Sequence, residues 1–473
     1  MNRIIQAAKV VPSKRQIEWQ EMEFYGFIHY TVNTYTDMEW GMGTESPEIF
    51  NPTEFDADQW VEVFKSAGMK GLILTCKHHD GFCLWPSPYT EHSVKNSPWK
   101  DGKGDIVREV SDACRKAGIK FGVYLSPWDR HEQTYGTDEY NEYFKNQLRE
   151  LLTEYGDIFC VWFDGACGEG PNGKRQVYDW EGYYSVVREL QPNAVISVCG
   201  PDVRWCGNEA GHCRTSEWSV VPATLRDEES IQDNSQKVDD GEFAKRINFQ
   251  DDDLGSREMI LDVVKLVWYP AEVNTSIRPG WFYHASEDDK VKSIDELLKV
   301  YYGSVGGNAT FLLNIPPDKR GLIHETDAAR LAEFGQVISK MFEENLATGA
   351  VVQGDETMSD QYRAANILDG NKETYWCPKE GTEQASLVIE LNDTKVFNRA
   401  VIQEHISSGQ RIESFIMEYW HNDSWNELYQ GTVVGYKRIC CFETVETNKV
   451  RIRITSSRWY PTISEFGLYY ASV

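Results

Sequence analysis

Polar side chains able to do acid–base or nucleophilic chemistry stand at the ends of several apolar runs in this 473-residue chain. His29 ends one run, His78 and His79 end the next, Tyr124 lies near the end of a third, and Asp164 ends a fourth. If the runs are strands of a parallel barrel, their carboxyl ends meet at the face where such groups react. A carboxylate placed there is costly unless it is paired or works as a base or nucleophile, so Asp164 is the leading candidate. A helix cap or a partner for an arginine is its alternative role.

The histidines are compatible with two kinds of site. Imidazoles together with Asp80 could ligate zinc. Neighbouring strand residues point to opposite faces, however, so His78 and His79 share a ligand only if the strand bends, and no HExxH motif occurs. In a sugar site, the same groups would bind hydroxyls while Trp rings cover the apolar face of the ring. The spacing of the histidines argues against a metal-dependent hydrolase, and the 16 Trp and 24 Tyr residues suit a sugar site, although most aromatic residues are expected in the core.

Up to about residue 345, apolar runs alternate with amphipathic segments. The runs are nearly continuous, as in parallel strands that are buried on both faces, and cover residues 24–30, 71–79, 119–127, 158–165, 194–200 and 309–317. Between them we expect helices at 56–68 and 105–118, each with an Asp cap and a closing Gly, and at 138–156, where apolar residues follow helical spacing. Repeated strand–helix units predict a parallel sheet with crossovers.

A closed barrel and an open doubly wound sheet both satisfy this pattern. No Gly-rich phosphate loop follows the first run, and about 300 residues suit a barrel with insertions, so residues 1–345 are predicted to form a catalytic (β/α)8-type barrel. Residues 222–257 interrupt the pattern with a polar stretch, which we interpret as a solvated surface insertion. After a helix at 326–346, short alternating runs separated by turns predict an antiparallel β-sandwich at 346–473.

The overall charge and the cysteines restrict the function and the compartment. A formal net charge of −26 argues against a nucleic-acid partner, and neutral glycans fit better than sulfated ones. No run is long enough for a membrane span, and the first residues lack an apolar signal core. Eleven cysteines without zinc-finger spacing are expected to be buried thiols, which favours a cytoplasmic location unless a signal segment has been removed.

Three strand-end motifs resemble the α-L-fucosidases of glycoside hydrolase family 29. They are FIH at 27–29, HHDGF at 78–82 and WFDG at 162–165, and the resemblance covers roughly residues 16–340. Tyr30 and Thr31 depart from the Trp-Gly that follows the His in many members. Three further motifs resemble the subgroup that is selective for α-1,3 and α-1,4 fucosyl linkages, namely GPDVRW at 200–205, GNE at 207–209 and IRPGWF at 277–282.

The resemblance implies a division of labour between two carboxyl groups. Asp164 is expected to be the nucleophile that forms a covalent fucosyl-enzyme. Glu209 is expected to be the general acid that protonates the departing oxygen and later activates water, with Glu217 as the rival for that role. The two carboxyls of a retaining glycosidase lie about 5 to 5.5 Å apart, and one of them has a raised pKa.

The resemblance also implies which side chains hold the sugar. The fucose hydroxyls are expected to contact His29, His78, His79 and Tyr124, with Trp281 beneath the apolar face of the ring. Glu39 and Trp40 resemble a further contacting pair, for which Glu45 competes with Glu39. No metal or organic cofactor is required, since this chemistry needs only the carboxylates and correct positioning.

The C-terminal segment resembles the discoidin-like sandwich of coagulation-factor C domains and of carbohydrate-binding module family 32. The resemblance rests on NLA at 345–347, ILDG at 367–370 and VRIRI at 450–454. It implies a structural calcium, with Asp369 as one source of oxygen ligands. Loop residues Arg411, Arg458, Trp459 and Tyr460 could hold a sugar or brace the barrel.

Together these inferences predict a retaining exo-α-L-fucosidase that acts on α-1,3/1,4-fucosylated, Lewis-type oligosaccharides or glycoconjugates. A catalytically silent carbohydrate-binding protein on the same scaffold is the main alternative from another class. The presence of both Asp164 and Glu209 favours the enzyme.

Overall fold

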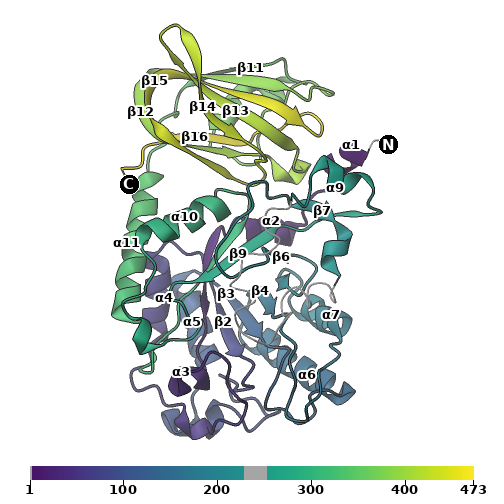
Figure 1. Ribbon diagram of the computed structural model, residues 1–473, viewed down its shortest axis with the longest axis vertical. Coiled ribbons are helices and arrows are strands. Elements are labelled where there is room, and N and C mark those ends of the chain that lie inside the picture. The colour runs from purple at the N-terminus through teal and green to yellow at the C-terminus, as the bar shows by residue number, and fades with distance from the viewer. Residues whose placement is uncertain (1–2, 228–252, 473) are drawn as a thin grey trace.

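The computed structural model describes residues 3–227 and 253–472, which form a barrel domain and a smaller β-sandwich domain. The sandwich lies at the top of Figure 1 and the barrel below it. The sequence-based boundary between residues 345 and 346 falls between the last barrel helix, which ends at Met341, and the first sandwich strand, which begins at Val351. Most of the predicted polar insertion, residues 228–252, lies outside the described part.

Eight strands form a parallel sheet in the order β5-β4-β3-β2-β1-β10-β9-β6. A parallel bridge between Ser197 and Val203 connects the two edges, so the sheet is a nearly closed barrel and the open doubly wound alternative is wrong. The strands are β1 (Phe24–Ile28), β2 (Gly71–Lys77), β3 (Lys120–Leu125), β4 (Ile158–Phe163), β5 (Val195–Val198), β6 (Arg204–Trp205), β9 (Ala271–Ser276) and β10 (Thr310–Asn314).

Two barrel strands, β6 and β9, were not predicted. β6 has only two residues, and β9 reads AEVNTS, which lacks the apolar run expected of a central strand. All of β9 is nevertheless buried. Its polar side chains are satisfied inside the barrel, because Trp162 Nε1 donates to Glu272 Oε1 at 2.8 Å and Trp205 Nε1 donates to Asn274 Oδ1 at 2.9 Å. A strand that faces polar partners need not be apolar.

The predicted helices form with the expected caps. Asp56 accepts from Gln59 N at 3.1 Å, Asp105 accepts from Arg108 N at 2.8 Å, and Gly118 ends its helix in the left-handed region at φ 73°. The barrel helices are α1 (Arg3–Ala8), α2 (Lys14–Gln20), α3 (Val32–Thr36), α4 (Ala57–Ser66), α5 (Ile106–Ala117), α6 (Asp138–Glu154), α7 (Trp180–Leu190), α9 (Arg257–Leu261), α10 (Ile294–Ser304) and α11 (Glu325–Met341).

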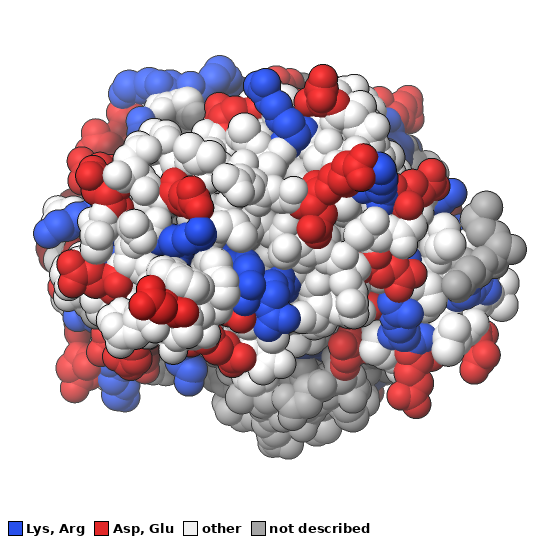
Figure 2. Space-filling view, turned by 90° about the horizontal axis from the view of Figure 1, so that it is seen from above, with Lys and Arg blue, Asp and Glu red and all other residues white. Residues whose placement is uncertain are grey.

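The second domain is an antiparallel sheet in the order β11-β12-β15-β13-β14, with β16 paired to β12. Its strands are β11 (Val351–Gly354), β12 (Ala385–Gln403), β13 (Ile412–His421), β14 (Ser424–Gly431), β15 (Arg438–Ser457) and β16 (Glu465–Tyr469). A separate two-stranded antiparallel sheet, β7 (Val220–Pro222) with β8 (Leu266–Trp268), belongs to the barrel domain. Seen from the sandwich end, acidic and basic side chains are interspersed over the surface (Figure 2).

The loops of the sandwich that carry Arg411, Arg458 and Trp459 pack on the barrel side of the molecule. The Arg458 guanidinium lies 3.4 Å from the ring centre of Trp218, and Lys9 Nζ lies 4.7 Å from that of Trp459. Arg458 is fully buried. These contacts favour the bracing role over the sugar-binding role for these loops.

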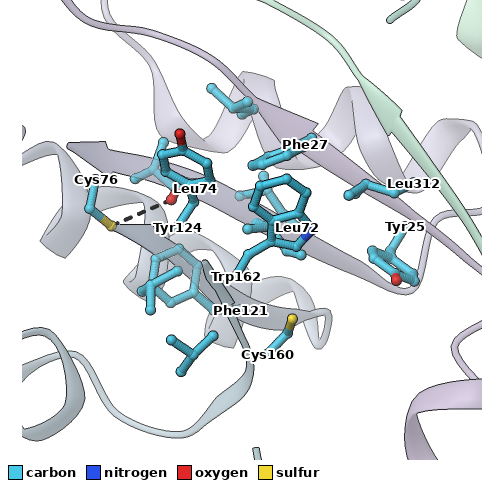
Figure 3. Packing of buried hydrophobic residues seen from close by; sticks show 14 of the residues in the cluster. Tyr25, Phe27, Leu72, Leu74, Cys76, Phe121, Tyr124, Cys160, Trp162 and Leu312 are labelled. Atoms are coloured by element: carbon cyan, nitrogen blue, oxygen red, sulfur yellow. Dashed lines mark hydrogen bonds between the residues drawn. The ribbon is translucent and has the colours of Figure 1, made fainter. Parts of the chain in front are cut away.

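The barrel interior is filled with aromatic and aliphatic side chains, including Phe27, Leu72, Tyr124 and Trp162 (Figure 3). In the part of the chain that the structure describes, no helix is long and apolar enough to cross a membrane. All eleven cysteines are free thiols and ten of them are at least partly buried, in line with the sequence-based expectation.

Candidate active site

The carboxylate of Asp164 lies directly after β4 and is held by three neighbours. Tyr124 Oη donates to its Oδ2 at 2.8 Å, Ala166 N donates to its Oδ1 at 2.8 Å, and His79 Nε2 lies 3.8 Å from Oδ2. About a quarter of the side chain is exposed. Burial and the charge of Asp164 raise the pKa of Tyr124 well above its usual value, so this tyrosine remains a donor.

His78 and His79 both face the site, because β2 ends at Lys77 after an irregularity in its register with β3. Their ring centres are 4.0 Å apart, and the ring of His29 lies 5.4 Å from that of His78. The condition set by the sequence, that the strand must bend, is therefore met.

Each outer imidazole is fixed by a polar partner. His29 Nδ1 pairs with Asn314 Oδ1 at 2.8 Å, and His79 Nδ1 pairs with Ser126 Oγ at 2.7 Å. The Nδ1 atom of His78 is buried without a hydrogen-bond partner among the described residues. A ring nitrogen in that state is ready to bind a hydroxyl group.

Burial keeps the three imidazoles neutral. It lowers the pKa of His29 and of His79 to about 4, and that of His78 well below its usual value, in part through repulsion from the other two rings. A neutral imidazole donates one hydrogen bond and accepts another, as a sugar hydroxyl requires. Within residues 3–227 and 253–472, no group of three or more His, Cys, Asp or Glu side chains is arranged to hold a metal ion.

Aromatic rings form two walls around these groups. The Trp281 ring lies 5.1 Å from that of His29 and 6.3 Å from that of Phe27. On the other side, the Trp40 ring stands edge-on to His79 at 5.9 Å and to Trp128 at 5.5 Å. Both predicted tryptophans therefore lie at the site, where their faces can cover apolar C–H groups of a sugar.

Glu209 follows β6 in a turn that its neighbours fix. Asn208 Oδ1 accepts from Ala210 N and from His212 N, both at 3.0 Å. The Glu209 side chain is partly exposed, and its Oε2 accepts from Trp281 Nε1 at 2.9 Å. The indole of Trp281 thus connects this carboxylate to the histidine cluster around Asp164.

Glu217, the rival acid, lies at the opposite end of the barrel. Its carboxylate accepts from Arg204, the first residue of β6, and its carbonyl oxygen accepts from Asn308, which precedes β10, at 2.8 Å. Although burial alone would raise the pKa of Glu217, Arg204 and Arg214 hold it below its usual range. A deeply paired carboxylate is a poor proton donor.

Glu39 supports the segment that carries Trp281. Its carboxylate accepts from Trp281 N at 2.8 Å, from Phe282 N at 3.1 Å and from His284 Nε2 at 2.7 Å. Burial alone would raise its pKa, but these donors lower it. Glu45, the rival for its role, accepts from Met42 N at 2.6 Å.

Sequence reasoning missed several residues of the site. Asn314 binds His29 and also donates to the carbonyl oxygen of Trp281 at 2.8 Å, yet it closes an otherwise apolar run. Its position as a polar residue at a strand end was the available signal. Ser126, directly after β3, offered the same signal, whereas His284 did not, because its role depends on carboxylates that are distant in the chain.

Comparisons with known proteins agree with this geometry. Residues 7–343 match the family described as Alpha-L-fucosidase, and residues 351–466 match the F5/8 type C domain. The chain therefore belongs to the alpha-L-fucosidase family. The family and the discoidin-like domain that the sequence motifs implied are confirmed, and membership implies a fucosylated glycan as substrate.

Three relatives illustrate how far the similarity of this family member extends. It is 44% identical to Alpha-L-fucosidase 1 of Arabidopsis thaliana, over 97% of this chain and 87% of the relative. A putative alpha-L-fucosidase from Bacteroides ovatus has a TM-score of 0.87 at 46% identity, over 99% of this chain and 76% of that one. A Ruminococcus gnavus GH29 fucosidase in complex with fucose has a TM-score of 0.85 at 33% identity, over 98% and 95% of the two chains.

Proposed function

We propose that this alpha-L-fucosidase is a retaining exo-enzyme that removes α-1,3/1,4-linked fucose from branched, Lewis-type oligosaccharides. The observation that carries the mechanism is a continuous set of contacts between two carboxylates. Asp164 accepts from Tyr124, the Tyr124 ring lies 5.9 Å from that of His29, and the ring of His29 contacts Trp281, which donates to Glu209. Glycoside hydrolysis uses two carboxyl groups that flank the bond to be broken, and these contacts support Asp164 and Glu209 as that pair.

In the proposed first step, an Asp164 oxygen attacks the anomeric carbon of fucose while Glu209 donates its proton to the departing glycosidic oxygen. In the second step, Glu209 takes a proton from water, which attacks the anomeric carbon and releases Asp164. The neutral imidazoles of His29, His78 and His79 orient the fucose hydroxyls without adding positive charge beside the nucleophile.

The linkage preference rests on the subgroup motifs at 200–205, 207–209 and 277–282, two of which place Glu209 and Trp281. The Ruminococcus gnavus fucosidase, whose complex contains fucose, supports fucose as the sugar bound here. The preference is measured by comparing release of fucose from Lewis-type trisaccharides with release from an α-1,2-fucosylated disaccharide.

Asp164→Ala, Glu209→Ala and Glu217→Gln, assayed on a Lewis-type trisaccharide and an aryl fucoside, test the two roles. Asp164→Ala should lose at least about 10³-fold on both substrates, because no other group can form the covalent intermediate. Glu209→Ala should lose much more on the trisaccharide, since the aryl leaving group needs little protonation. Glu217→Gln, assayed at the same concentration of folded protein, should keep the wild-type ratio of activity on the trisaccharide to activity on the aryl fucoside.

Three outcomes would contradict the proposal. If β-L-fucose is released first, as measured by NMR, the enzyme inverts. If Glu217→Gln loses much more activity on the trisaccharide than on the aryl fucoside, the acid is Glu217. If the wild type releases no fucose but Asp164→Ala still binds it, the silent carbohydrate-binding protein is correct.

We also propose a structural calcium in the sandwich, as the discoidin-like resemblance implied. Asp369 Oδ2 accepts from Thr374 Oγ1 at 2.7 Å. Burial and the nearby charge of Asp369 raise the pKa of Glu465 to about 7. The Oε1 atom of Glu465 is buried without a hydrogen-bond partner among the described residues. Oxygen ligands with an unsatisfied carboxylate fit a hard cation.

Chelation should therefore destabilise this enzyme without touching its chemistry. We expect EDTA to lower the melting temperature by several degrees and added Ca²⁺ to restore it, since a ligand bound only by the folded state stabilises it. The kcat on the aryl fucoside at 25 °C should stay unchanged. An unchanged melting temperature would exclude a calcium ion that stabilises the fold. A loss of kcat on chelation would instead support the alternative of a metal-dependent hydrolase.

A further inference from the structure

A histidine outside the predicted site bridges two carboxylates directly behind Trp281. His284 Nδ1 lies 2.7 Å from Asp37 Oδ1, and His284 Nε2 lies 2.7 Å from Glu39 Oε1. Ionised carboxylates only accept hydrogen bonds, so both ring nitrogens must donate, and the imidazole must be doubly protonated. The hydrogen bonds with Glu39 and Asp37 raise the pKa of His284 to about 9, which makes it a cation at neutral pH.

The carboxylate of Glu39 links His284 to the backbone of Trp281. The same carboxylate that meets His284 accepts from Trp281 N and Phe282 N. The approach is close, because a Cβ atom on Gly280 would lie 2.7 Å from Glu39 Oε1 and 2.8 Å from His284 Cδ2. Any side chain at position 280 would therefore push the two partners apart.

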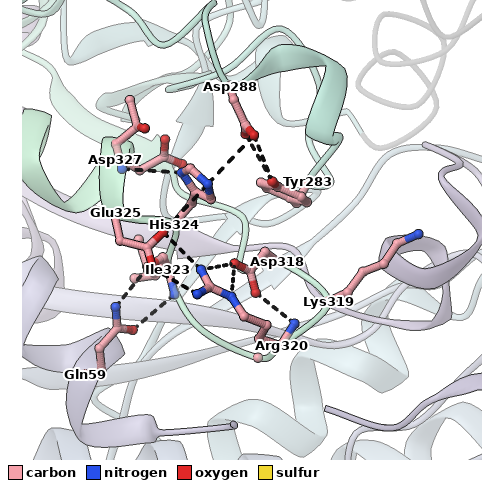
Figure 4. A network of polar contacts seen from close by, with 12 residues as sticks. Gln59, Tyr283, Asp288, Asp318, Lys319, Arg320, Ile323, His324, Glu325 and Asp327 are labelled. Carbon is pink, nitrogen blue, oxygen red and sulfur yellow. Dashed lines mark hydrogen bonds and ion pairs between the residues drawn. The ribbon is translucent and has the colours of Figure 1, made fainter. Parts of the chain in front are cut away.

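Trp281 is held on its other sides by contacts that do not involve this bridge. Its carbonyl oxygen accepts from Asn314 Nδ2 at 2.8 Å. Farther along the segment, Tyr283 Oη donates to Asp288 at 3.0 Å, within the polar network that includes His324 (Figure 4). The amide of Trp281 has Glu39 as its acceptor, so the orientation of the indole depends on where Glu39 is fixed.

The charged side chains that act most strongly on His284 are acidic. Asp37 follows α3, Glu39 lies two residues later, and Glu287 belongs to the turn Ala285–Glu287. Without its second proton, the ring could donate to only one of its two carboxylate partners. The negative charges would then repel each other across the segment that carries Trp281.

We propose that His284, as an imidazolium bound to Asp37 and Glu39, is a positioning residue that orients the Trp281 indole and thereby the general acid Glu209. This inference rests on the proposed function, in which Glu209 protonates the leaving group. His284 holds Glu39, Glu39 holds the Trp281 amide, and the indole nitrogen holds Glu209 Oε2 at 2.9 Å.

The test is the dependence of kcat/KM on leaving-group pKa, measured with a series of aryl fucosides and a Lewis-type trisaccharide. In His284→Ala the acid is misplaced, so activity should fall about 10- to 100-fold on the trisaccharide and less than about threefold on the most activated aryl fucoside. His284→Gln, which keeps one donor for Glu39, should be intermediate, and free imidazole should partly rescue His284→Ala.

His324→Ala is the matched control. His324 lies in the neighbouring network, 3.7 Å from Asp288, and within the described part of the chain no hydrogen bond or ion pair joins it to Glu39. The dependence of kcat/KM on leaving-group pKa in His324→Ala should equal that of the wild type. Thermal melting of every variant separates loss of folded protein from loss of turnover.

The results distinguish the two claims. If Glu209→Ala steepens the leaving-group dependence but His284→Ala and His284→Gln lower activity equally on all substrates, His284 is merely structural and this inference is overturned. Unchanged activity in both His284 variants overturns it as well. If Glu209→Ala itself fails to steepen the dependence, the acid assignment in the proposed function is wrong.

Discussion

Burial sets the protonation state of the groups proposed to hold the sugar. His29 is an ordinary imidazole whose pKa falls to about 4 because the barrel mouth excludes water from it, although Asn314 and nearby carboxylates partly oppose the shift. His284, with two carboxylate partners, shifts in the opposite direction. The same residue type is thus neutral in one place and a cation in the other, as the proposed roles of His29 and His284 require.

At the residue scale, His29 should make stability depend on pH. Its folded-state pKa lies below the unfolded value, so between about pH 4 and 6.5 the unfolded chain binds the extra proton, and stability falls as pH falls. The difference in unfolding free energy between wild type and His29→Gln should shrink by up to about 3 kcal/mol from pH 7 to pH 4. Urea titrations at several pH values measure it.

The exposed His421 provides the control for that experiment. His421→Gln, measured in parallel, shows how much of any change comes simply from replacing an exposed histidine with glutamine. If the free energy of unfolding changes equally with pH in His29→Gln and in the wild type, His29 binds protons equally in the folded and unfolded states.

At the element scale, the packing of α4 on β1 depends on a residue without a side chain. Gly26 lies in the middle of β1, and a Cβ atom there would meet Phe64 Cε1 of α4 at 1.7 Å. The helix therefore approaches the strand more closely than any other residue at position 26 would allow.

Gly26→Ala should destabilise the protein by about 1 to 3 kcal/mol, because the Phe64 ring must move in a closely packed core. Phe64→Ala removes the obstructing ring, so Gly26→Ala should cost much less in that background. Chemical denaturation of the four proteins of this cycle gives the coupling energy. Additive effects would mean that the clash is relieved elsewhere.

At the scale of the whole molecule, a buried arginine of the sandwich contacts the barrel domain. Arg458 lies over Trp218, donates to the carbonyl oxygen of Gly255 and pairs with Glu413 at 3.4 Å. Glu217, the rival candidate for the acid, also lies at this contact between the domains, because Gln410 Nε2 donates to its carbonyl oxygen at 3.3 Å.

Arg458→Ala should lower the unfolding free energy by about 2 to 4 kcal/mol and separate the melting of the two domains, because it removes a buried paired charge and its aromatic contact. Calorimetry would show a second transition. Arg453→Ala is the control, since Arg453 pairs with Glu418 on a partly exposed face of the sandwich. A single transition at the wild-type temperature in Arg458→Ala would show that the contact between the two domains does not depend on this residue.

Local signals in the sequence determined the strand–helix alternation, the Asp caps of α4 and α5, and the change to a sandwich. They also placed Asp164, His29 and the His78–His79 pair at strand ends, because a buried parallel strand is apolar until it reaches the site. The motifs then identified the family. All of these are properties of short segments.

Only the tertiary structure decided matters that depend on distant partners. β9 is a central strand although it is polar, because Trp162 and Trp205 satisfy its side chains across the barrel. The sequence left Glu209 and Glu217 as competitors, whereas folding places one beside Trp281 and pairs the other with arginines at the opposite end. The charge on His284 likewise exists only because two carboxylates from another segment face its ring nitrogens.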